Sequence, residues 1–219
     1  MAIVAMVVFH FSFDLSFLGL TDWPVGSHPA WRAFAMATAG TFLFLVGVSL
    51  VYAHGRGVRW RPFLRRLAVI AAAAAAVTVG TAIAMPYPVW FGILHAIATF
   101  SVLAIPFLRA PIWLIVGAAA AVFVAPWVLT HPMFQPVWFY PLGLSPAPMP
   151  SFDYEPIFPW FAATLAGVAA ARLAPPPKAT PGPGGALAWL GRNSLWIYLV
   201  HQPVLLTLLI GWTWVARVV

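Results

Sequence analysis

Few side chains in the apolar segments of this 219-residue sequence could do chemistry. His10 and Asp14 are four positions apart in the first of these segments, so on a helix they share one face. A carboxylate one turn from an imidazole can fix the tautomer of the ring and raise its basicity. His95 lies in a later apolar segment, and His201 and Gln202 lie in the last one. These spacings favour acid–base or nucleophilic chemistry carried by histidine.

The same residues also have purely structural explanations. Asp14 could lie at a membrane interface, with His10 as a packed polar residue. His95 could be hydrogen-bonded to a backbone carbonyl. Asp153 and Glu155 stand at the start of an apolar segment, where the dipole of a helix N-terminus favours negative charge. For Asp153 and Glu155 taken alone, the dipole is the favoured explanation.

The composition indicates a membrane protein. Hydrophobic residues make up 63% of the chain, charged residues make up 7%, and the mean hydropathy is +0.95. A soluble domain has about 25% charged residues, so this chain has too little charge to cover a water-soluble globule. Soluble enzymes, disordered chains and nucleic-acid binders are therefore excluded. The lack of cysteine excludes disulfides, thiolate metal sites and a cysteine nucleophile.

Seven apolar segments are expected to position these side chains, the first of them short. A crossing helix needs about 20 apolar residues. The segments are 1–20, 30–53, 62–85, 88–108, 111–129, 156–174 and 194–216. A short amphipathic stretch, 186–191, precedes the last one, and loops are expected at 130–155 and 175–185. The sequence thus predicts an all-α polytopic membrane helical bundle, a single transmembrane domain over 1–219, with His95 seven residues into its span.

The basic residues predict the orientation of this bundle. If the segments alternate in direction, nine of the eleven Lys and Arg residues fall on one side. They are Arg56, Arg59, Arg61, Arg65, Arg66, Arg109, Arg172, Lys178 and Arg192. Arg32, Arg217 and all four acids fall on the other side. Because cytoplasmic loops are enriched in Lys and Arg, we predict a cytoplasmic N-terminus and an external C-terminus. His28, His54 and His131 fall in loops and are expected to be solvated.

Three segments and one pair of segments resemble a known family. They are VVFHFSFDL (7–15), FLFLVGVSL (42–50), FGILHAIA (91–98), and DYEPIFPWFAATLAG (153–167) with LGRNSLWIYLVHQPVLL (190–206). In this order they resemble bacterial relatives of the heparan-alpha-glucosaminide N-acetyltransferase catalytic domain, a branch of the transmembrane acyltransferases. The resemblance covers nearly the whole chain. Two features depart from it: the usual Asp-x-Leu-Arg-Gly stretch before the first histidine is absent, and Asn193 stands where the family often has His.

The resemblance implies an acetyltransferase that uses acetyl-CoA as co-substrate and no metal. His10 matches the active-site histidine, either as a nucleophile that takes the acetyl group or as a general base on the acceptor. In both cases Asp14 would orient it. His95 and His201 would polarise the thioester carbonyl or hold the acceptor, and His10 and His95 can meet if their helices are neighbours.

The remaining candidates would bind the two substrates. Gln202, Asp153 and Arg32 are expected to bind the acceptor, an amino sugar or glycan at the outer face. Arg65 and Arg66 are expected to attract the phosphates of CoA. The orientation signal explains these two arginines equally well without a ligand.

The expected partners are the lipid bilayer, an acyl-CoA, the sugar or glycan acceptor and a second copy of the chain, with no nucleic acid. The expected location is the inner (plasma) membrane, as a multi-pass protein. One alternative function is a transporter or flippase without acyl chemistry, in which the intramembrane His and Asp are proton or substrate sites. Another is a haem or quinone protein with His10, His95 or His201 as axial ligands.

Overall fold

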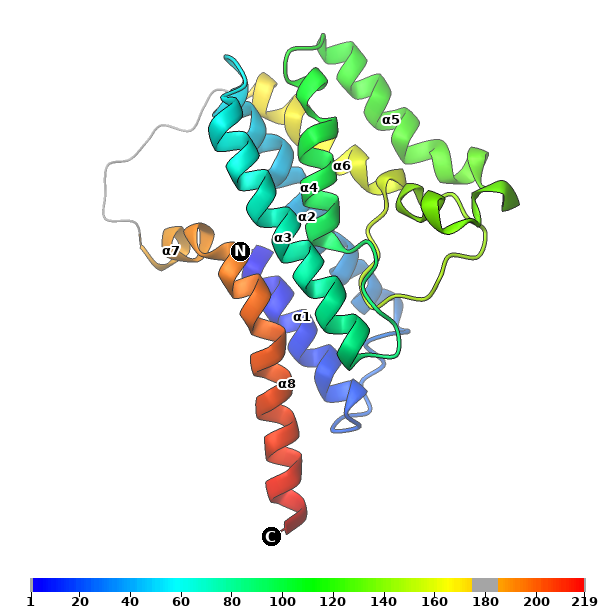
Figure 1. Ribbon diagram of the computed structural model, residues 1–219, viewed down its shortest axis with the longest axis vertical. Helices are drawn as coiled ribbons and strands as arrows, with labels where there is room; N and C mark the ends of the chain where they lie inside the picture. The colour runs from blue at the N-terminus through cyan, green and yellow to red at the C-terminus, as the bar shows by residue number, and fades with distance from the viewer. Residues whose placement is uncertain (1, 175–184, 219) are drawn as a thin grey trace. The chain divides into compact units, whose positions relative to one another are not determined.

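The computed structural model describes residues 2–174 and 185–218, which fold mainly into helices (Figure 1). The α-helices are α1 (Ala2–Phe17), α2 (Pro29–His54), α3 (Trp60–Ala84), α4 (Ile93–Leu103), α5 (Ile112–Leu129), α6 (Ile157–Leu173), α7 (Ala186–Arg192) and α8 (Ser194–Val218). Short 3-10 helices are η1 (Ile105–Leu108), η2 (Pro132–Phe134) and η3 (Val137–Leu142). The all-α fold class is thus confirmed. Lys178 and nearly all of the expected loop 175–185 lie outside the described residues.

Four helices are long and apolar enough to cross a membrane: α2, α3, α5 and the Ser194–Ala216 part of α8. Each begins and ends within two residues of its predicted segment. The helices α1, α4 and α6 are also apolar but have 16, 11 and 17 residues. At about 1.5 Å per residue, each is shorter than a 30 Å hydrocarbon layer. The number of crossing helices and their orientation remain predictions.

Tertiary contacts divide the chain into two compact units. The first comprises Met1–Ala39 and Ala179–Val219, and the second comprises Gly40–Lys178. In the first unit α1 packs against α8; in the second, α5 packs against α6 and α3 against α4. The single domain over 1–219 remains a prediction.

The first helix is shorter than its predicted segment of residues 1–20. It ends at Phe17, and Gly19 then adopts a left-handed conformation with φ of +68°. The backbone N–H of Leu20 donates to the carbonyl of Leu15, and that of Gly19 donates to Ser16. Such bonds satisfy the last helical carbonyls, and glycine takes the left-handed position without steric cost. The helix therefore stops where Gly19 allows the chain to turn.

The fourth predicted span, 88–108, is wrong at its start, because α4 begins only at Ile93. Residues before it pair with a distant loop: the N–H of Glu155 donates to the carbonyl of Phe91 at 2.9 Å, and Phe91 forms an isolated parallel bridge with Tyr154. This pairing holds the chain extended as far as Gly92, whose ψ is −170°. His95 is consequently the third residue of its helix and does not lie seven residues into a span.

Two glycines bring α2 and α6 into close contact in the second unit. A Cβ atom on Gly47 would lie 2.0 Å from the carbonyl oxygen of Thr164, and one on Gly167 would lie 2.0 Å from that of Phe44. The Thr164 hydroxyl donates to the carbonyl of Leu43 at 3.0 Å. Small residues let helix backbones approach closely, as expected for helices packed in lipid.

The expectation of a solvated His54 is wrong. The residue is buried at the end of α2, where its ring meets the edge of Phe63 with centroids 5.6 Å apart. Its Nδ1 accepts a hydrogen bond from the backbone N–H of Arg59 at 3.3 Å. The polar ring thus closes the turn between α2 and α3. His28 and His131 are exposed, as predicted.

Candidate active site

In the first unit, α1 and α8 bring together four of the predicted site residues. The rings of His10 and His201 meet edge to face, with centroids 4.9 Å apart and an interplanar angle of 72°. The side-chain amide of Gln202 donates to Oδ1 of Asp14 at 2.7 Å. On α1 the two residues are four positions apart and share one face, whereas on α8 they are adjacent, about 100° apart, and both reach α1. The packing of α1 on α8 therefore produces one polar cluster from the two ends of the chain.

Hydrogen bonds to carbonyls fix the tautomers of both histidines in this cluster. Nδ1 of His10 lies 3.0 Å from the carbonyl oxygen of Met6, and Nδ1 of His201 lies 2.6 Å from that of Tyr198. A carbonyl oxygen only accepts, so both Nδ1 atoms carry the proton. Each Nε2 then has a free lone pair, which is the form that a base or nucleophile needs.

Asp14 pairs with Gln202 and not with His10. The expected orientation of His10 by Asp14 therefore takes another form: the Met6 carbonyl holds the ring, and the carboxylate ties α1 to α8. Asp14 and His10 share a helix face, but the ring satisfies its donor within its own helix. A backbone carbonyl one turn back competes with the Asp14 carboxylate for the Nδ1 proton of His10. The sequence spacing of His10 and Asp14 does not show which acceptor the ring takes.

Three buried acceptor atoms of this cluster lack a hydrogen-bond partner. They are Oδ2 of Asp14, Oε1 of Gln202 and Nε2 of His201. Asp14 itself is only 1% exposed. Buried polar atoms are normally paired, and unpaired ones mark strain, a functional role or an additional bound group. The cluster therefore has unused capacity to accept hydrogen bonds.

His95 lies in the second unit, where Thr78 of α3 holds it. The Thr78 hydroxyl donates to the carbonyl of Val89 at 2.7 Å, which uses its single proton. The contact of 3.2 Å between Thr78 Oγ1 and His95 Nε2 must then be donated by the ring, leaving the lone pair on Nδ1. The Ala-rich sequence around Thr78 gave no sign of this role. The meeting of His10 with His95 remains a prediction, since the two lie in different units.

Asp153 caps the helix that carries His95. Its Oδ2 accepts the backbone N–H of Ile93, the first residue of α4, at 2.9 Å. A Cβ atom on Gly92 would lie 2.2 Å from that oxygen, so the carboxylate needs glycine at this position. Ser151 secures the same loop, because its single hydroxyl proton is shared between the carbonyls of Pro88 at 3.0 Å and Asp153 at 2.8 Å. The dipole explanation thus applies to α4, and not to α6 as the sequence suggested.

Removing this cap is expected to loosen the start of α4. Asp153→Ala should lower the free energy of unfolding by about 1 kcal/mol, the usual effect of losing an N-cap side chain. Asp153→Asn should lower the free energy of unfolding much less, because the Asn oxygen can still accept the N–H of Ile93. Thermal unfolding in detergent, compared with the parent chain, measures both. Equal losses for the two variants would contradict a capping role.

Glu155 is a half-buried acidic residue beside Asp153. Its Oε2 is buried without a hydrogen-bond partner. Burial, followed by the nearby Asp153 charge, raises the pKa of Glu155 from 4.5 to about 9. Both effects disfavour the ionised form. Glu155 therefore carries a proton at neutral pH, next to the carboxylate that caps α4.

The pKa of Glu155 predicts how stability depends on pH. The raised pKa means that the folded chain holds a proton which the unfolded chain releases above pH 4.5. Stability contributed by this group is therefore complete below about 4.5 and is lost as pH rises toward about 9. Glu155→Gln should remove this part of the alkaline decline in melting temperature. An unchanged pH profile in the variant, with detergent and salt held constant, would refute the assignment.

The arginine candidates occupy exposed positions. Arg32 lies on the first turn of α2, and Arg65 and Arg66 lie near the start of α3. Two other arginines bind loop carbonyls: Arg109 donates to Arg56, and Arg172 donates to Ala110. These last two side chains therefore serve the connections between helices.

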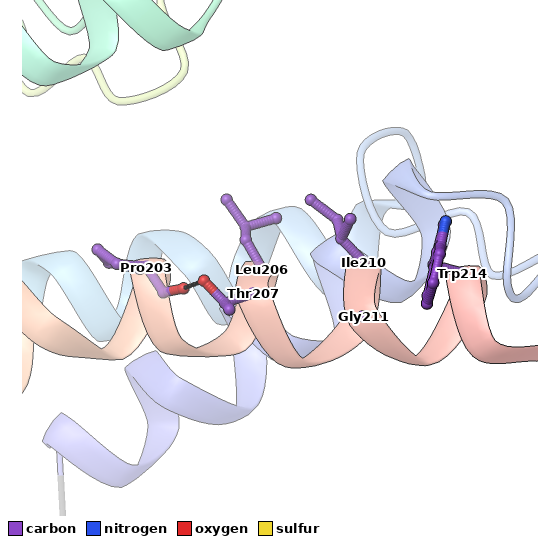
Figure 2. A pocket seen from close by; sticks show the side chains of 6 residues that line it. All are labelled: Pro203, Leu206, Thr207, Ile210, Gly211 and Trp214. Atoms are coloured by element: carbon purple, nitrogen blue, oxygen red, sulfur yellow. Dashed lines mark hydrogen bonds between the residues drawn. The ribbon is translucent and has the colours of Figure 1, made fainter.

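A concave surface along α8 carries no titratable side chain (Figure 2). It is lined by Pro203, Leu206, Thr207, Ile210, Gly211 and Trp214. All six residues come from a single helix, so they form an open groove and not an enclosed cavity. The Thr207 hydroxyl donates to the carbonyl of Pro203 at 2.7 Å, within the same helix. The groove therefore offers no group for acid–base chemistry, unlike the His10–His201 cluster.

Comparison with known proteins gave one match to a family. The model of the family described as "Heparan-alpha-glucosaminide N-acetyltransferase, catalytic" matches residues 1–203. No curated protein and no solved structure matched the chain. The matched range includes α1 and continues into α8 as far as Pro203, and so contains all the residues of the His10–His201 cluster.

Proposed function

Because the chain belongs to the heparan-alpha-glucosaminide N-acetyltransferase catalytic family, a family of transmembrane acetyltransferases, we propose that it transfers acetyl from acetyl-CoA to an amino sugar or glycan. The observation that carries this proposal is the His10–His201 contact between α1 and α8. Both rings hold their proton on Nδ1 and keep a lone pair on Nε2. Acetyl transfer needs such a group, since the acceptor must lose a proton as it reacts.

The geometry suits two forms of the reaction. As a general base, Nε2 of His10 takes the proton of the acceptor amine or hydroxyl while that atom attacks the thioester carbonyl. The C–S bond breaks, and the CoA thiolate receives the proton. As a nucleophile, Nε2 attacks the carbonyl itself, so that an N–C bond forms, the C–S bond breaks and CoA leaves as a thiolate. The acceptor then displaces the acetyl group from the ring, and the CoA thiolate receives the proton that the acceptor loses. His201, whose ring centroid lies 4.9 Å from that of His10, is assigned the role of accepting or returning a proton in either form.

Other polar residues are assigned to binding in this proposal. His95, held by Thr78 at the start of α4, polarises the thioester carbonyl or holds the acceptor. Arg32 binds the acceptor from the outer side. Arg65 and Arg66 are exposed on α3 and attract the phosphates of CoA from the cytoplasmic side of a plasma membrane.

A transporter without acyl chemistry is the second candidate. The observation in its favour is the buried, partly unpaired carboxylate of Asp14, because ionisable residues inside membranes often belong to proton or substrate pathways. The two candidates differ in whether a covalent product forms.

One experiment separates them. Purified protein is reconstituted into proteoliposomes and supplied with radiolabelled acetyl-CoA on one side and a panel of amino sugars and glycans on the other. Acetylated acceptor, identified by mass spectrometry, supports the acetyltransferase. Acceptor that crosses the membrane unmodified, with no acetyl product for any acceptor, would instead support the transporter.

A further inference from the structure

We propose that Gln202 is a positioning residue: its hydrogen bond to Asp14 fixes the rotation and axial position of α8 against α1 at which His10 and His201 meet. This assignment gives Gln202 and Asp14 a role different from acceptor binding or from direct orientation of His10. Its catalytic consequences rest on the proposed acetyltransferase function. Its structural consequences do not.

The hydrogen bonds of the other polar side chains in this part of α1, His10 and Ser12, do not reach α8. Nδ1 of His10 bonds the carbonyl of Met6, and the hydroxyl of Ser12 donates to the carbonyl of Val8 at 2.9 Å. Both partners belong to α1. The bond of 2.7 Å between Gln202 and Asp14, in contrast, joins residues 188 positions apart in the sequence. This hydrogen bond therefore constrains the position of α8 relative to α1.

This bond also settles the direction of the Gln202 side chain. The amide nitrogen faces Asp14, because turning the amide over would place its oxygen against the carboxylate. A hydrogen bond to a charged acceptor is about twice as strong as a neutral one, and burial strengthens it further. Asp14 is 1% exposed, so water does not compete for the bond. These conditions make it a fixed contact, not a transient surface one.

The position of Gln202 links this contact to catalysis. It directly follows His201, and successive residues of a helix are about 100° and 1.5 Å apart. If α8 slips by one residue along α1, the His201 ring turns away by that angle. Holding Gln202 on Asp14 therefore also holds His201 on His10, whose rings are 4.9 Å apart. The edge-to-face ring contact alone is too weak to resist such a slip.

The absence of native cysteine allows a direct test. The pair His10→Cys and His201→Cys provides the two thiols of the chain, at the point where the helices meet. Disulfide formation under copper phenanthroline is followed by the loss of thiol labelling with a polyethylene-glycol maleimide. When Gln202→Leu is added to the two cysteine substitutions, the rate of disulfide formation should fall by roughly tenfold. This is the factor expected for losing a charge-assisted hydrogen bond.

An exchange of the two polar groups is the decisive variant. In the double variant Asp14→Asn with Gln202→Glu, the amide lies on α1 and the carboxylate on α8, so the hydrogen bond can form in the opposite direction. Cross-linking should return to within about twofold of the parent pair. Thr207→Val is the matched control on α8, because its hydroxyl bonds Pro203 of the same helix, and it should leave the rate unchanged.

Each outcome bears on the proposal. The positioning role of Gln202 would be overturned if Gln202→Leu cross-linked as fast as the parent pair. It would also be overturned if the exchange variant folded but cross-linked slowly. If Gln202→Leu does not accumulate as a monodisperse protein, the exchange variant alone decides. With both histidines restored, Gln202→Leu should lower kcat for acetyl transfer and leave KM for acetyl-CoA unchanged, and the exchange should recover kcat. If the parent chain itself transfers no acetyl group, the proposed function is rejected. The cross-linking result would still test the positioning role of Gln202.

Discussion

Replacing His10 by Ala is expected to lower acetyl transfer from acetyl-CoA by about 10³-fold, within the range of 10² to 10⁴ that a positioned general base contributes. The reason is that the Met6 carbonyl keeps the proton of this ring on Nδ1, so that Nε2 holds the lone pair that the reaction requires. The measurement is the initial rate of label transfer from radiolabelled acetyl-CoA in proteoliposomes. Transfer at the parental rate would remove His10 from the mechanism.

His28→Asn is the matched control for this prediction. His28 is an exposed histidine in the same unit, and its Nδ1 accepts the backbone N–H of Ala30 at 3.2 Å at the start of α2. The oxygen of Asn can accept the same N–H, since Asn is a preferred residue at helix N-termini. His28→Asn is thus expected to leave the rate of acetyl transfer unchanged.

The same assay distinguishes the two roles of His10. A nucleophile would retain radiolabelled acetyl on the protein when the acceptor is omitted, and the label would disappear in His10→Ala. A general base would give no label in either protein, and transfer would require both substrates at once. Kinetics with varied acetyl-CoA and acceptor would then show intersecting lines and not parallel ones.

Gly47→Ala is expected to have the largest effect on stability. The added Cβ would lie 2.0 Å from the carbonyl oxygen of Thr164 and 2.8 Å from the backbone nitrogen of Val168. Backbone atoms cannot turn aside as the end of a side chain can, so α2 and α6 must separate. Overpacking of this kind costs about 1–3 kcal/mol or more. Melting temperature and the yield of monodisperse protein in detergent measure the loss, and Gly167→Ala should behave in the same way.

Glycines in open space provide the controls for this prediction. A Cβ on Gly80 of α3 or on Gly117 of α5 would meet nothing within 4 Å. Substitution by Ala there should leave stability unchanged or raise it by up to about 1 kcal/mol, because Ala is the better helix former. If Gly47→Ala melted like Gly80→Ala, the close approach of α2 and α6 would be wrong.

Much of the architecture could be predicted from local sequence. Composition alone identified a membrane protein, and apolar length located α2, α3, α5 and α8 within two residues. These features depend on hydrophobicity and helix length, which short windows of sequence contain. The motif segments indicated the family, and the match over residues 1–203 confirmed it.

The hydrogen-bond partners within the candidate site could not be predicted from local sequence. The sequence identified His10, Asp14, His201 and Gln202 as polar residues in apolar segments, but the spacing of His10 and Asp14 suggested the wrong pair. Asp14 bonds Gln202, which is 188 residues away, because the His10 ring finds a nearer acceptor in its own helix. A spacing shows which groups can meet, but competition among all available partners decides which ones do.

The sequence by itself determined the class of protein, the main helices and the polar side chains that lie within apolar segments, since each follows from residue type and local pattern. Only the tertiary structure decided that Asp153 caps α4, that this helix begins at Ile93, and that Gly47 and Gly167 admit the backbone of a neighbouring helix. These features depend on contacts between segments far apart in the chain. The physical reason is that packing brings distant backbone donors and acceptors together, and no short stretch of sequence specifies such a partner.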